Sequence, residues 1–286
     1  SKAFEKFQKL YKIDSENGTV CYHLGELYAG QNFREEAIFH AEKSVELDPS
    51  NKWFKKGLAS VYRKFEITDK LITVFSELVD LDPENPDLNY ELALAYANND
   101  DFKKALEQLN ILEEIIGANE IVTEQKKQIH LIQGDFDAAV EESEKLIEAF
   151  PKEMKFRSSL GELYMGNNLY DEALEVFEKM LEISPETPRS QLNLAEYYRK
   201  TANKDKSIFY LKKAIANPLL EIDQKIPTLL SLFAASERDS ALKVEAYNML
   251  ADVIKTNPED ELNVHCAQKT VGAQVIRVPW KVMPVI

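Results

Sequence analysis

The chain has 286 residues, 44% of them hydrophobic and 29% charged, which is the composition of a folded protein with a core. Acidic residues outnumber basic residues 49 to 35, and the formal charge of −14 argues against nucleic acid as a partner, because phosphate binding needs a basic face. Cys21 and Cys266 are too few for a disulfide framework or a zinc site, and no apolar run is long enough to predict a membrane span.

The first 17 residues predict one helix, because apolar side chains recur on one helical face at Ala3, Phe7 and Leu10. Residues 18–51 predict two more helices. Their first stretch, GTVCYHLGELYAGQ, has apolar residues at helical spacing, and AIFHAEKSVEL forms a second apolar stripe after a polar turn. The Asp-Pro pair that follows ends the second helix, because proline cannot continue a helix and disfavours helix in the residue before it.

This helical hairpin recurs every 34 residues. Pro49 and Pro83 are 34 positions apart, and so are Pro151 and Pro185. A column that is mostly alanine has the same spacing: Ala3, Ala37, Leu71, Ala105, Ala139, Ala173 and Ser207. A column that is mostly tyrosine also has it: Tyr28, Tyr62, Tyr96, His130, Tyr164 and Tyr198. Three columns in one register predict an array of identical supersecondary units.

The hairpins are expected to follow one another without a gap over six units: 18–51, 52–85, 86–119, 120–153, 154–187 and 188–221. A seventh is expected at 227–260, after an insertion of five residues. Residues 261–286 are expected to begin a short helix and then to form an extended, non-helical apolar tail, because TVGAQVIRVPWKVMPVI is rich in β-branched residues and contains two prolines.

The pattern resembles the tetratricopeptide repeat (TPR), a 34-residue helical hairpin with the signal aromatic-x2-Leu-Gly-x2-Tyr followed by Ala, an apolar residue, Ala and Pro. The chain matches this signal at Leu24, Gly25, Tyr28, Ala37, Ala41, Ser44 and Pro49, and again at Leu160, Gly161, Tyr164, Ala173, Phe177, Met180 and Pro185. The resemblance implies an all-α, right-handed superhelical solenoid of antiparallel helix pairs. Small residues such as Gly25 and Gly161 are expected where helices approach closely. The lysine- and asparagine-rich composition favours a bacterial protein.

The unit at 120–153 departs from the pattern. Lys126, Lys127 and His130 stand where leucine, a small residue and tyrosine are expected, and Gly117 replaces the preceding proline. Because the stability of a repeat array depends on interfaces between neighbours, we expect the first helix of this unit to dock loosely and to exchange its amides fastest among the interior helices. A flexible joint, a kink and simple sequence drift are the alternatives.

No pattern for catalysis or cofactor binding occurs. Glycine-rich phosphate motifs are absent, and the four histidines have no metal-ligand spacing. His265 and Cys266 are adjacent, so their side chains would not face each other on a helix. Acidic pairs such as Glu35-Glu36 are expected on exposed helix faces. We therefore expect no enzyme activity, no cofactor and no metal site.

The resemblance implies a partner-binding surface, because the first helices of TPR proteins line a concave groove that holds a partner segment. By register, the groove residues are Tyr22, Glu26, Trp53, Lys56, Arg63, Tyr90, Leu94, Leu131, Met165, Arg189, Leu192 and Arg199. The register also places there Ser60, Asp87, Glu124, Gln128, Lys155, Glu162 and Glu196. Trp53 is the main candidate anchor, and its alternative role is packing beneath a neighbouring turn. The lysine-and-asparagine set that holds chaperone C-termini is not assembled.

The sequence thus favours a non-catalytic scaffold whose groove holds a segment of a partner protein. The alternative is a targeting or regulatory arm of a larger enzyme or signalling protein whose other domain lies outside this chain. Self-association is a third possibility, with the apolar tail and its Trp280 as one candidate surface. Residues 1–17 are expected to be the second helix of a truncated repeat, so the chain begins inside a repeat and we expect a truncated N-terminus. Bacterial cytoplasm and periplasm both remain open.

Overall fold

The structure is a computed structural model that describes residues 2–236 and 239–256. These residues form helices connected by turns, and no strand occurs among them, which confirms the all-α prediction for this part of the chain. None of these helices is long and apolar enough to cross a membrane. The apolar tail that the sequence predicts within 261–286 lies outside the described residues.

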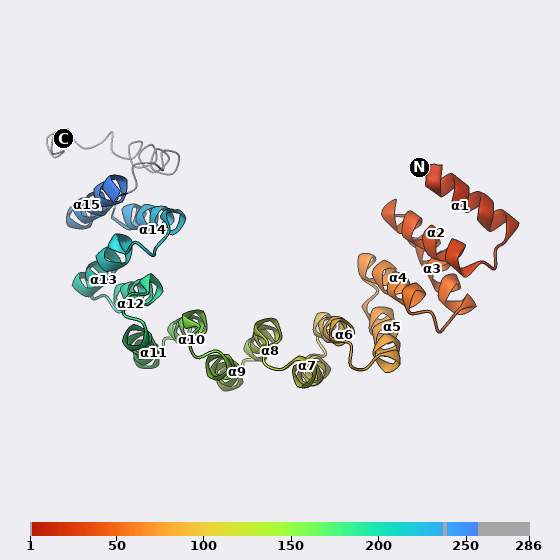
Figure 1. Cartoon of the computed structure of the whole chain (residues 1–286), viewed down its shortest axis with the longest axis horizontal. Helices are drawn as coiled ribbons and strands as arrows, with labels where there is room; N and C mark the ends of the chain where they lie inside the picture. Colours follow the sequence, from red (N-terminus) through yellow and green to blue (C-terminus); the bar gives the residue numbers. More distant parts are fainter. Residues whose placement is uncertain (1, 237–238, 257–286) are drawn as a thin grey trace. The chain divides into compact units, whose positions relative to one another are not determined.

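Successive helices form hairpins joined by short turns (Figure 1). In chain order they are α1 (Lys2–Ile13), α2 (Gly18–Gly30), α3 (Arg34–Leu47), α4 (Lys52–Lys64), α5 (Thr68–Leu81), α6 (Pro86–Asn98), α7 (Phe102–Ile116), α8 (Glu120–Ile132), α9 (Phe136–Ala149), α10 (Met154–Gly166), α11 (Tyr170–Ile183), α12 (Pro188–Lys200), α13 (Lys204–Ala216), α14 (Ile222–Ala235) and α15 (Ser240–Thr256).

The last described hairpin begins earlier than expected. Helix α14 starts at Ile222 and contains Pro227, whereas the sequence pattern placed residues 222–226 in an insertion before this hairpin. Proline is tolerated here because it lies in the first turns of the helix, where its missing N–H removes a single intrahelical hydrogen bond. The extra residues therefore lengthen the start of the first helix.

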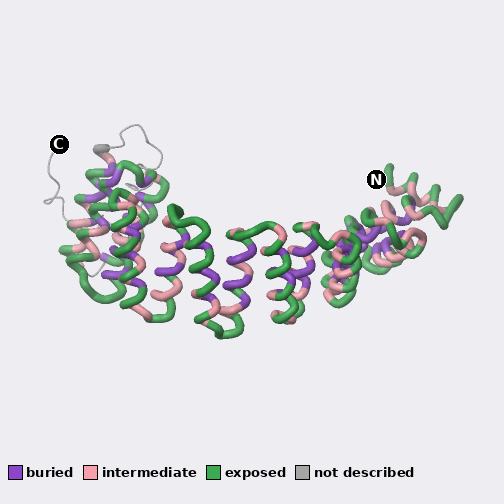
Figure 2. The backbone as a smooth tube through the Cα atoms, turned by 60° about the horizontal axis from the view of Figure 1, so that its bottom comes forward, coloured by how far each residue is buried: buried purple, intermediate pink, exposed green. Residues whose placement is uncertain are grey.

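The chain forms two compact units, residues 1–149 and residues 150–286. Unit 1 contains α1 to α9, and unit 2 contains α10 to α15. Buried residues recur along the helices of each unit, as expected when every hairpin packs on its neighbours (Figure 2). Each unit thus has its own hydrophobic clusters.

Asparagine caps the first helix of each of the four hairpins of unit 1. The side-chain oxygens of Asn17, Asn51, Asn85 and Asn119 accept hydrogen bonds from backbone N–H groups in the first turns of α2, α4, α6 and α8. Such caps satisfy donors that have no partner within the helix. The N-cap residues of α10 and α12 make no side-chain cap hydrogen bond.

One residue in each of six turns between first and second helices adopts a left-handed backbone. These residues recur at 34-residue spacing, with φ between 55° and 75°: Asn32, Glu66, Asp100, Gly134, Asn168 and Ala202. Glycine and asparagine tolerate this conformation, whereas other L-residues are strained in it. The repeat thus imposes the same turn on five different residue types.

The small residues lie at close contacts, as the sequence predicts. A Cβ placed on Gly25 would lie 3.0 Å from the backbone nitrogen of Ala41 and 3.2 Å from its Cβ. At Gly161 the added carbon would lie 2.1 Å from the ring of Phe177. Helices α2 and α10 therefore need glycine to approach their second helices.

The expectation that lysine prevents tight docking of α8 is wrong. The Lys126 side chain is 2% exposed, and its Nζ lies 2.8 Å from Glu113 Oε2 of α7 and 3.0 Å from Glu142 Oε1 of α9. Lys127 is also buried, with its Nζ 2.5 Å from Glu124 Oε2. Carboxylates of the neighbouring helices compensate the charge of Lys126, and a carboxylate of α8 itself compensates that of Lys127. Fast amide exchange in α8 stays a prediction.

Candidate functional site

The first helices of the first two hairpins are joined by an aromatic contact. The Tyr22 ring of α2 lies so close to Gly57 of α4 that a Cβ on this glycine would be 2.4 Å from the ring. The same ring stacks on Phe54, with 5.7 Å between centroids. The Tyr22 hydroxyl donates a hydrogen bond of 2.8 Å to Glu26, and burial together with this bond raises the pKa of Tyr22 to about 12. Tyr22 therefore connects α2 and α4.

Trp53 lies in the first turn of α4 and its side chain points to solvent. It is 74% exposed, so the alternative of packing beneath a neighbouring turn is wrong. Asn51, the cap of α4, accepts hydrogen bonds from the backbone N–H groups of Trp53 and Phe54 and so fixes this first turn. Lys56 Nζ lies 5.8 Å from the Trp53 ring centroid, on the same side of the helix. Trp53 and Lys56 thus form one exposed aromatic and cationic patch.

A recess of about 220 Å³ lies beside this patch, between α4 and α6. Its lining combines apolar atoms with charged groups of both signs: Lys56, Ala59, Ser60, Arg63, Phe75, Asp87, Leu88 and Glu91. Basic residues come from α4 and acidic residues from α6, while Phe75 comes from α5. An apolar side chain entering the recess would therefore contact both apolar atoms and polar groups of either sign.

An ion pair holds one end of the recess. The Arg63 guanidinium donates two hydrogen bonds to the Glu91 carboxylate, one of them 3.3 Å long, and lies 5.4 Å from the Phe75 ring centroid. Two parallel hydrogen bonds fix the plane of the guanidinium. Arg63 is therefore positioned before any partner binds.

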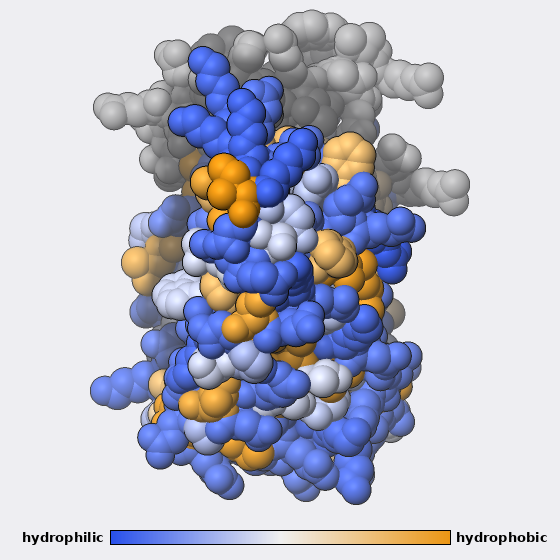
Figure 3. All heavy atoms as spheres, turned by 90° about the vertical axis from the view of Figure 1, so that its right-hand side faces the viewer, coloured by the Kyte–Doolittle hydropathy of each residue, from blue (hydrophilic) through white to orange (hydrophobic). Residues whose placement is uncertain are grey.

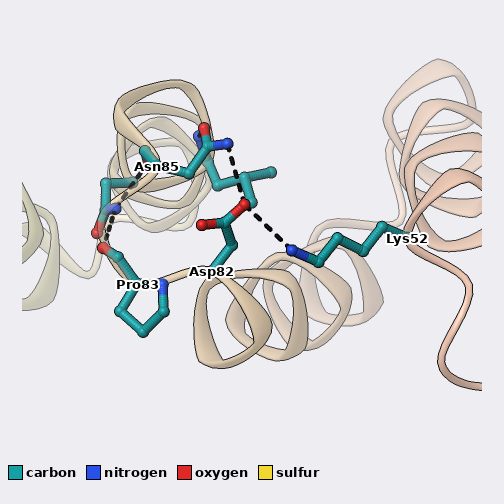
Figure 4. A network of polar contacts seen from close by, with 6 residues as sticks. Lys52, Asp82, Pro83 and Asn85 are labelled. Atoms are coloured by element: carbon teal, nitrogen blue, oxygen red, sulfur yellow. Dashed lines mark hydrogen bonds and ion pairs between the residues drawn. The ribbon is translucent and has the colours of Figure 1, made fainter.

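A second network fixes the ends of the same helices. Lys52 Nζ at the start of α4 lies 3.1 Å from Asp82 Oδ2, which also accepts a hydrogen bond from Asn85, the cap of α6 (Figure 4). These hydrogen bonds lower the pKa of Asp82. The Lys55 ammonium pairs with Glu77 of α5. Lys56 has no carboxylate partner in the part of the chain that the structure describes, so its charge remains available.

The other predicted groove residues are spread over both units. In unit 1, Tyr90 packs against a hydrophobic cluster, Leu94 and Leu131 are half-buried, and Glu26 is exposed. These four do not line the recess.

The remaining four lie in unit 2. Met165 and Leu192 pack against hydrophobic clusters, and Arg189 is exposed. The Arg199 guanidinium pairs with Glu196, 2.5 Å away. Only Trp53, Lys56 and Arg63 of the twelve are therefore brought together at the patch and recess.

The repeat register did not predict that three apolar residues, Ala59, Phe75 and Leu88, line the recess. It also did not predict that Arg63 pairs with Glu91. A signal for the pairing exists in the sequence. Opposite charges 28 residues apart also pair between Glu42 and Lys70, so this separation brings residues of successive hairpins together. Among residues 2–236 and 239–256, no group of three or more His, Cys, Asp or Glu side chains could hold a metal ion.

Comparison with known sequences identifies one family. Two sequence profiles, both described as "Tetratricopeptide repeat", match the chain, one at residues 72–119 and 128–188 and the other at residues 18–51 and 188–217. No curated protein matches the chain.

Two solved structures show the same fold. The C-terminal part of a TPR repeat-containing protein from Cytophaga hutchinsonii is 17% identical with a TM-score of 0.51, covering 85% of this chain and 98% of its own. A chain from the structure of Naa15/Naa10 bound to HypK-THB is 14% identical with a TM-score of 0.53, covering 95% of this chain and 53% of its own. MamA is 24% identical with a TM-score of 0.47, covering 60% of this chain and 94% of its own.

Proposed function

Because this chain belongs to the tetratricopeptide repeat family, we propose that it is a non-catalytic scaffold that binds a segment of a partner protein along its first helices. Proteins of this family generally mediate protein–protein interactions. Within unit 1, the patch of Trp53 and Lys56 and the adjoining recess form the main part of the proposed binding face. The exposure of Trp53 is the observation that carries this assignment.

An exposed tryptophan on a first helix supports partner binding for an energetic reason. Tryptophan and arginine are enriched among the residues that dominate binding energy, and removal of such an anchor costs about 2 kcal/mol or more. Trp53 retains most of its surface in water in the free protein, at 74% exposure, so a partner can bury it without displacing an internal contact. Asn51 already fixes the backbone of this turn. Binding therefore requires little reorganisation.

The recess suits one side chain of a polypeptide. Its volume of about 220 Å³ is below the range of roughly 300–1,000 Å³ typical of pockets for small molecules and cofactors. Ala59, Phe75 and Leu88 supply apolar contact, and the Arg63–Glu91 pair closes one end. We assign to the recess an apolar side chain of the partner, with Trp53 covering the neighbouring residue.

A peptide-display library of random sequences tests this proposal without a known partner. Peptides selected on the full chain are measured by fluorescence polarisation against the parent and Trp53→Ala, with Leu81→Ala as the control, because Leu81 is an exposed apolar residue at the end of α5. We expect Trp53→Ala to weaken binding about 30-fold or more, in keeping with the cost of a lost anchor, and the control to change it less than threefold. Equal affinity for the parent and Trp53→Ala would contradict the proposed site.

A further inference from the structure

Two phenylalanines of the second helices are half-exposed at one register position. Phe39 of α3 is 54% exposed and Phe209 of α13 is 52% exposed, and they lie 170 residues (five times 34) apart. The second helices between them carry polar residues at this position: Thr73, Glu107, Glu141 and Glu175. The hairpin therefore does not require phenylalanine here.

Isolated exposed apolar residues are normal on a protein surface, and Figure 3 shows hydrophobic side chains scattered among hydrophilic ones. The charges around the two phenylalanines distinguish them. We define the α3 face as Phe39 with the charged residues within two turns on its side of the helix: Glu35, Glu36, Glu42, Lys43 and Glu46. The α13 face is Phe209 with its equivalents: Asp205, Lys206, Lys212 and Lys213.

The α3 face has an excess of negative charge. Two of its charges are compensated within the chain, since Lys43 Nζ lies 2.9 Å from Glu16 and Glu42 lies 2.7 Å from Lys70 Nζ. In the described part of the chain, no ion pair involves the remaining three charges of this face: Glu35, Glu36 and Glu46. The negative charges of these three exposed residues are therefore available to another molecule.

The α13 face has the opposite excess. Lys213 Nζ lies 4.9 Å from the Phe209 ring centroid, and Lys206 Nζ lies 4.8 Å from the Tyr198 ring centroid, but neither ammonium has a carboxylate partner among the described residues. Lys212 is compensated by Glu245, 2.5 Å away. A chain with a formal charge of −14 thus presents a basic face around one exposed aromatic ring.

We propose that the α3 face of one copy of this chain docks on the α13 face of a second copy. Each face offers a half-exposed phenylalanine, and the net uncompensated charge around the two rings has opposite sign. Three acidic residues remain on the α3 face, whereas two lysines outnumber one acidic residue, Asp205, on the α13 face. A second copy supplies an apolar partner for each exposed ring and charges of the sign that each face lacks. The contact joins two different faces, so it is head-to-tail and extends into chains of molecules unless the geometry closes a ring.

The expected association is weak and depends on salt. One helix face on each side buries less than the roughly 800 Å² per partner of a standard interface. Exposed charge pairs are screened at high ionic strength, over a Debye length of about 3 Å at 1 M salt. Self-association should therefore appear at high protein concentration and decrease as salt rises.

Sedimentation velocity over a concentration series of the full chain tests the apolar half of the contact. We expect the weight-average sedimentation coefficient of the parent to rise with concentration, and Phe39→Ser or Phe209→Ser to weaken association at least tenfold. Ile183→Ser serves as the matched control, because Ile183 is 48% exposed at the end of another second helix. Trp53→Ala should associate like the parent, which separates this contact from the proposed peptide-binding face.

Charge reversal tests the electrostatic half. A chain with Glu35→Lys and Glu36→Lys has two basic faces, and a chain with Lys206→Glu and Lys213→Glu has two acidic faces, so each alone should stay monomeric. An equimolar mixture restores opposite signs at every contact, and we expect it to associate like the parent. Monomeric parent protein at all concentrations, association that persists in both phenylalanine variants, or a mixture that stays monomeric would overturn the proposal.

Discussion

Lys126 Nζ lies 3.0 Å from Glu142 Oε1, and the two side chains are 2% and 6% exposed. Every equivalent first-helix position of the other five hairpins in register is leucine: Leu24, Leu58, Leu92, Leu160 and Leu194. Glu113 supplies a second carboxylate to Lys126 at 2.8 Å. Among the described residues, Glu142 Oε2 has no hydrogen-bond partner. A buried charge cluster thus replaces an apolar contact in one hairpin.

Removal of Lys126 alone should destabilise unit 1 strongly. Lys126→Ala leaves Glu142 without its buried counter-charge, and loss of one partner of a buried ion pair costs about 3–5 kcal/mol. Replacement of the whole cluster by residues of the array pattern, with Glu113→Val, Lys126→Leu and Glu142→Val, should leave stability unchanged or raise it by about 1–4 kcal/mol. Urea unfolding followed by circular dichroism measures both effects.

Lys145 provides the control for this series. Its side chain is 50% exposed although its Nζ lies 2.6 Å from Glu142 Oε1, so Lys145→Ala should cost less than about 1 kcal/mol. A triple variant that is less stable than Lys126→Ala would show that the cluster is a net source of stability. In that case the desolvation argument for this hairpin is wrong.

This cluster also shows where sequence reasoning stops. The hairpins and their register follow from periodicity, because a 34-residue repeat fixes which residues face a neighbour. The register also places Trp53 on a first helix but leaves open whether its ring is exposed or packs beneath a turn. The same register places Lys126 in the core but does not reveal its carboxylates, since Glu113 and Glu142 come from two other helices. The recess was missed for a similar reason, because Phe75 reaches it from a second helix. Contacts between residues at different positions of the repeat depend on how the helices are placed relative to one another. The periodicity does not specify that placement.

The stability of unit 1 should fall as the pH falls below the ordinary pKa of histidine. The buried His40 ring stacks on Tyr28, with 5.4 Å between centroids, and meets the edge of Tyr11 at 4.7 Å. Burial and then the charge of Lys43 lower the pKa of His40, while Glu36 acts in the opposite direction. The folded state therefore binds a proton less readily than the unfolded state. Stability from neutral His40 is present above about pH 6.5 and is lost as the pH falls through the lowered pKa.

Unfolding free energies of the parent and of His40→Leu, measured between pH 7.5 and 5, test this expectation. The parent should lose stability over this range, and His40→Leu should lose less of it, because the titrating group is gone. His23→Gln is the control, since His23 is partly exposed beside Glu26. The same slope in the parent and in His40→Leu would assign the pH dependence to other groups.

Capping explains a further difference between hairpins. Asn51 accepts hydrogen bonds from two N–H groups of α4, so Asn51→Ala should cost about 1 kcal/mol and also loosen the turn that carries Trp53. Glu153 caps α10 without a side-chain hydrogen bond, so Glu153→Asn should gain a similar amount. Thermal unfolding of both variants measures the two shifts. Glu153→Ala is the control, because Glu153 makes no capping hydrogen bond. If Asn51→Ala and Glu153→Ala lowered the melting temperature equally, the Asn51 side chain would not stabilise α4 through capping.

The left-handed turn position predicts opposite effects of glycine and alanine. Ala202 has φ of 58°, and an L-residue without a polar side chain pays about 1–2 kcal/mol for this conformation. Ala202→Gly removes that strain but adds about 0.5–1 kcal/mol of backbone entropy to the unfolded state, so we expect a net gain of about 0.5 kcal/mol. Gly134 has φ of 75° at the equivalent turn, and Gly134→Ala should lose about 0.5 kcal/mol by the same two effects with opposite sign. The space around Gly134 is open, with no atom within 4 Å of an added Cβ, so any loss there reports backbone strain and not a steric clash. Chemical unfolding of the two single variants decides the matter, since a gain in Gly134→Ala would mean that entropy of the unfolded chain outweighs the strain of this turn.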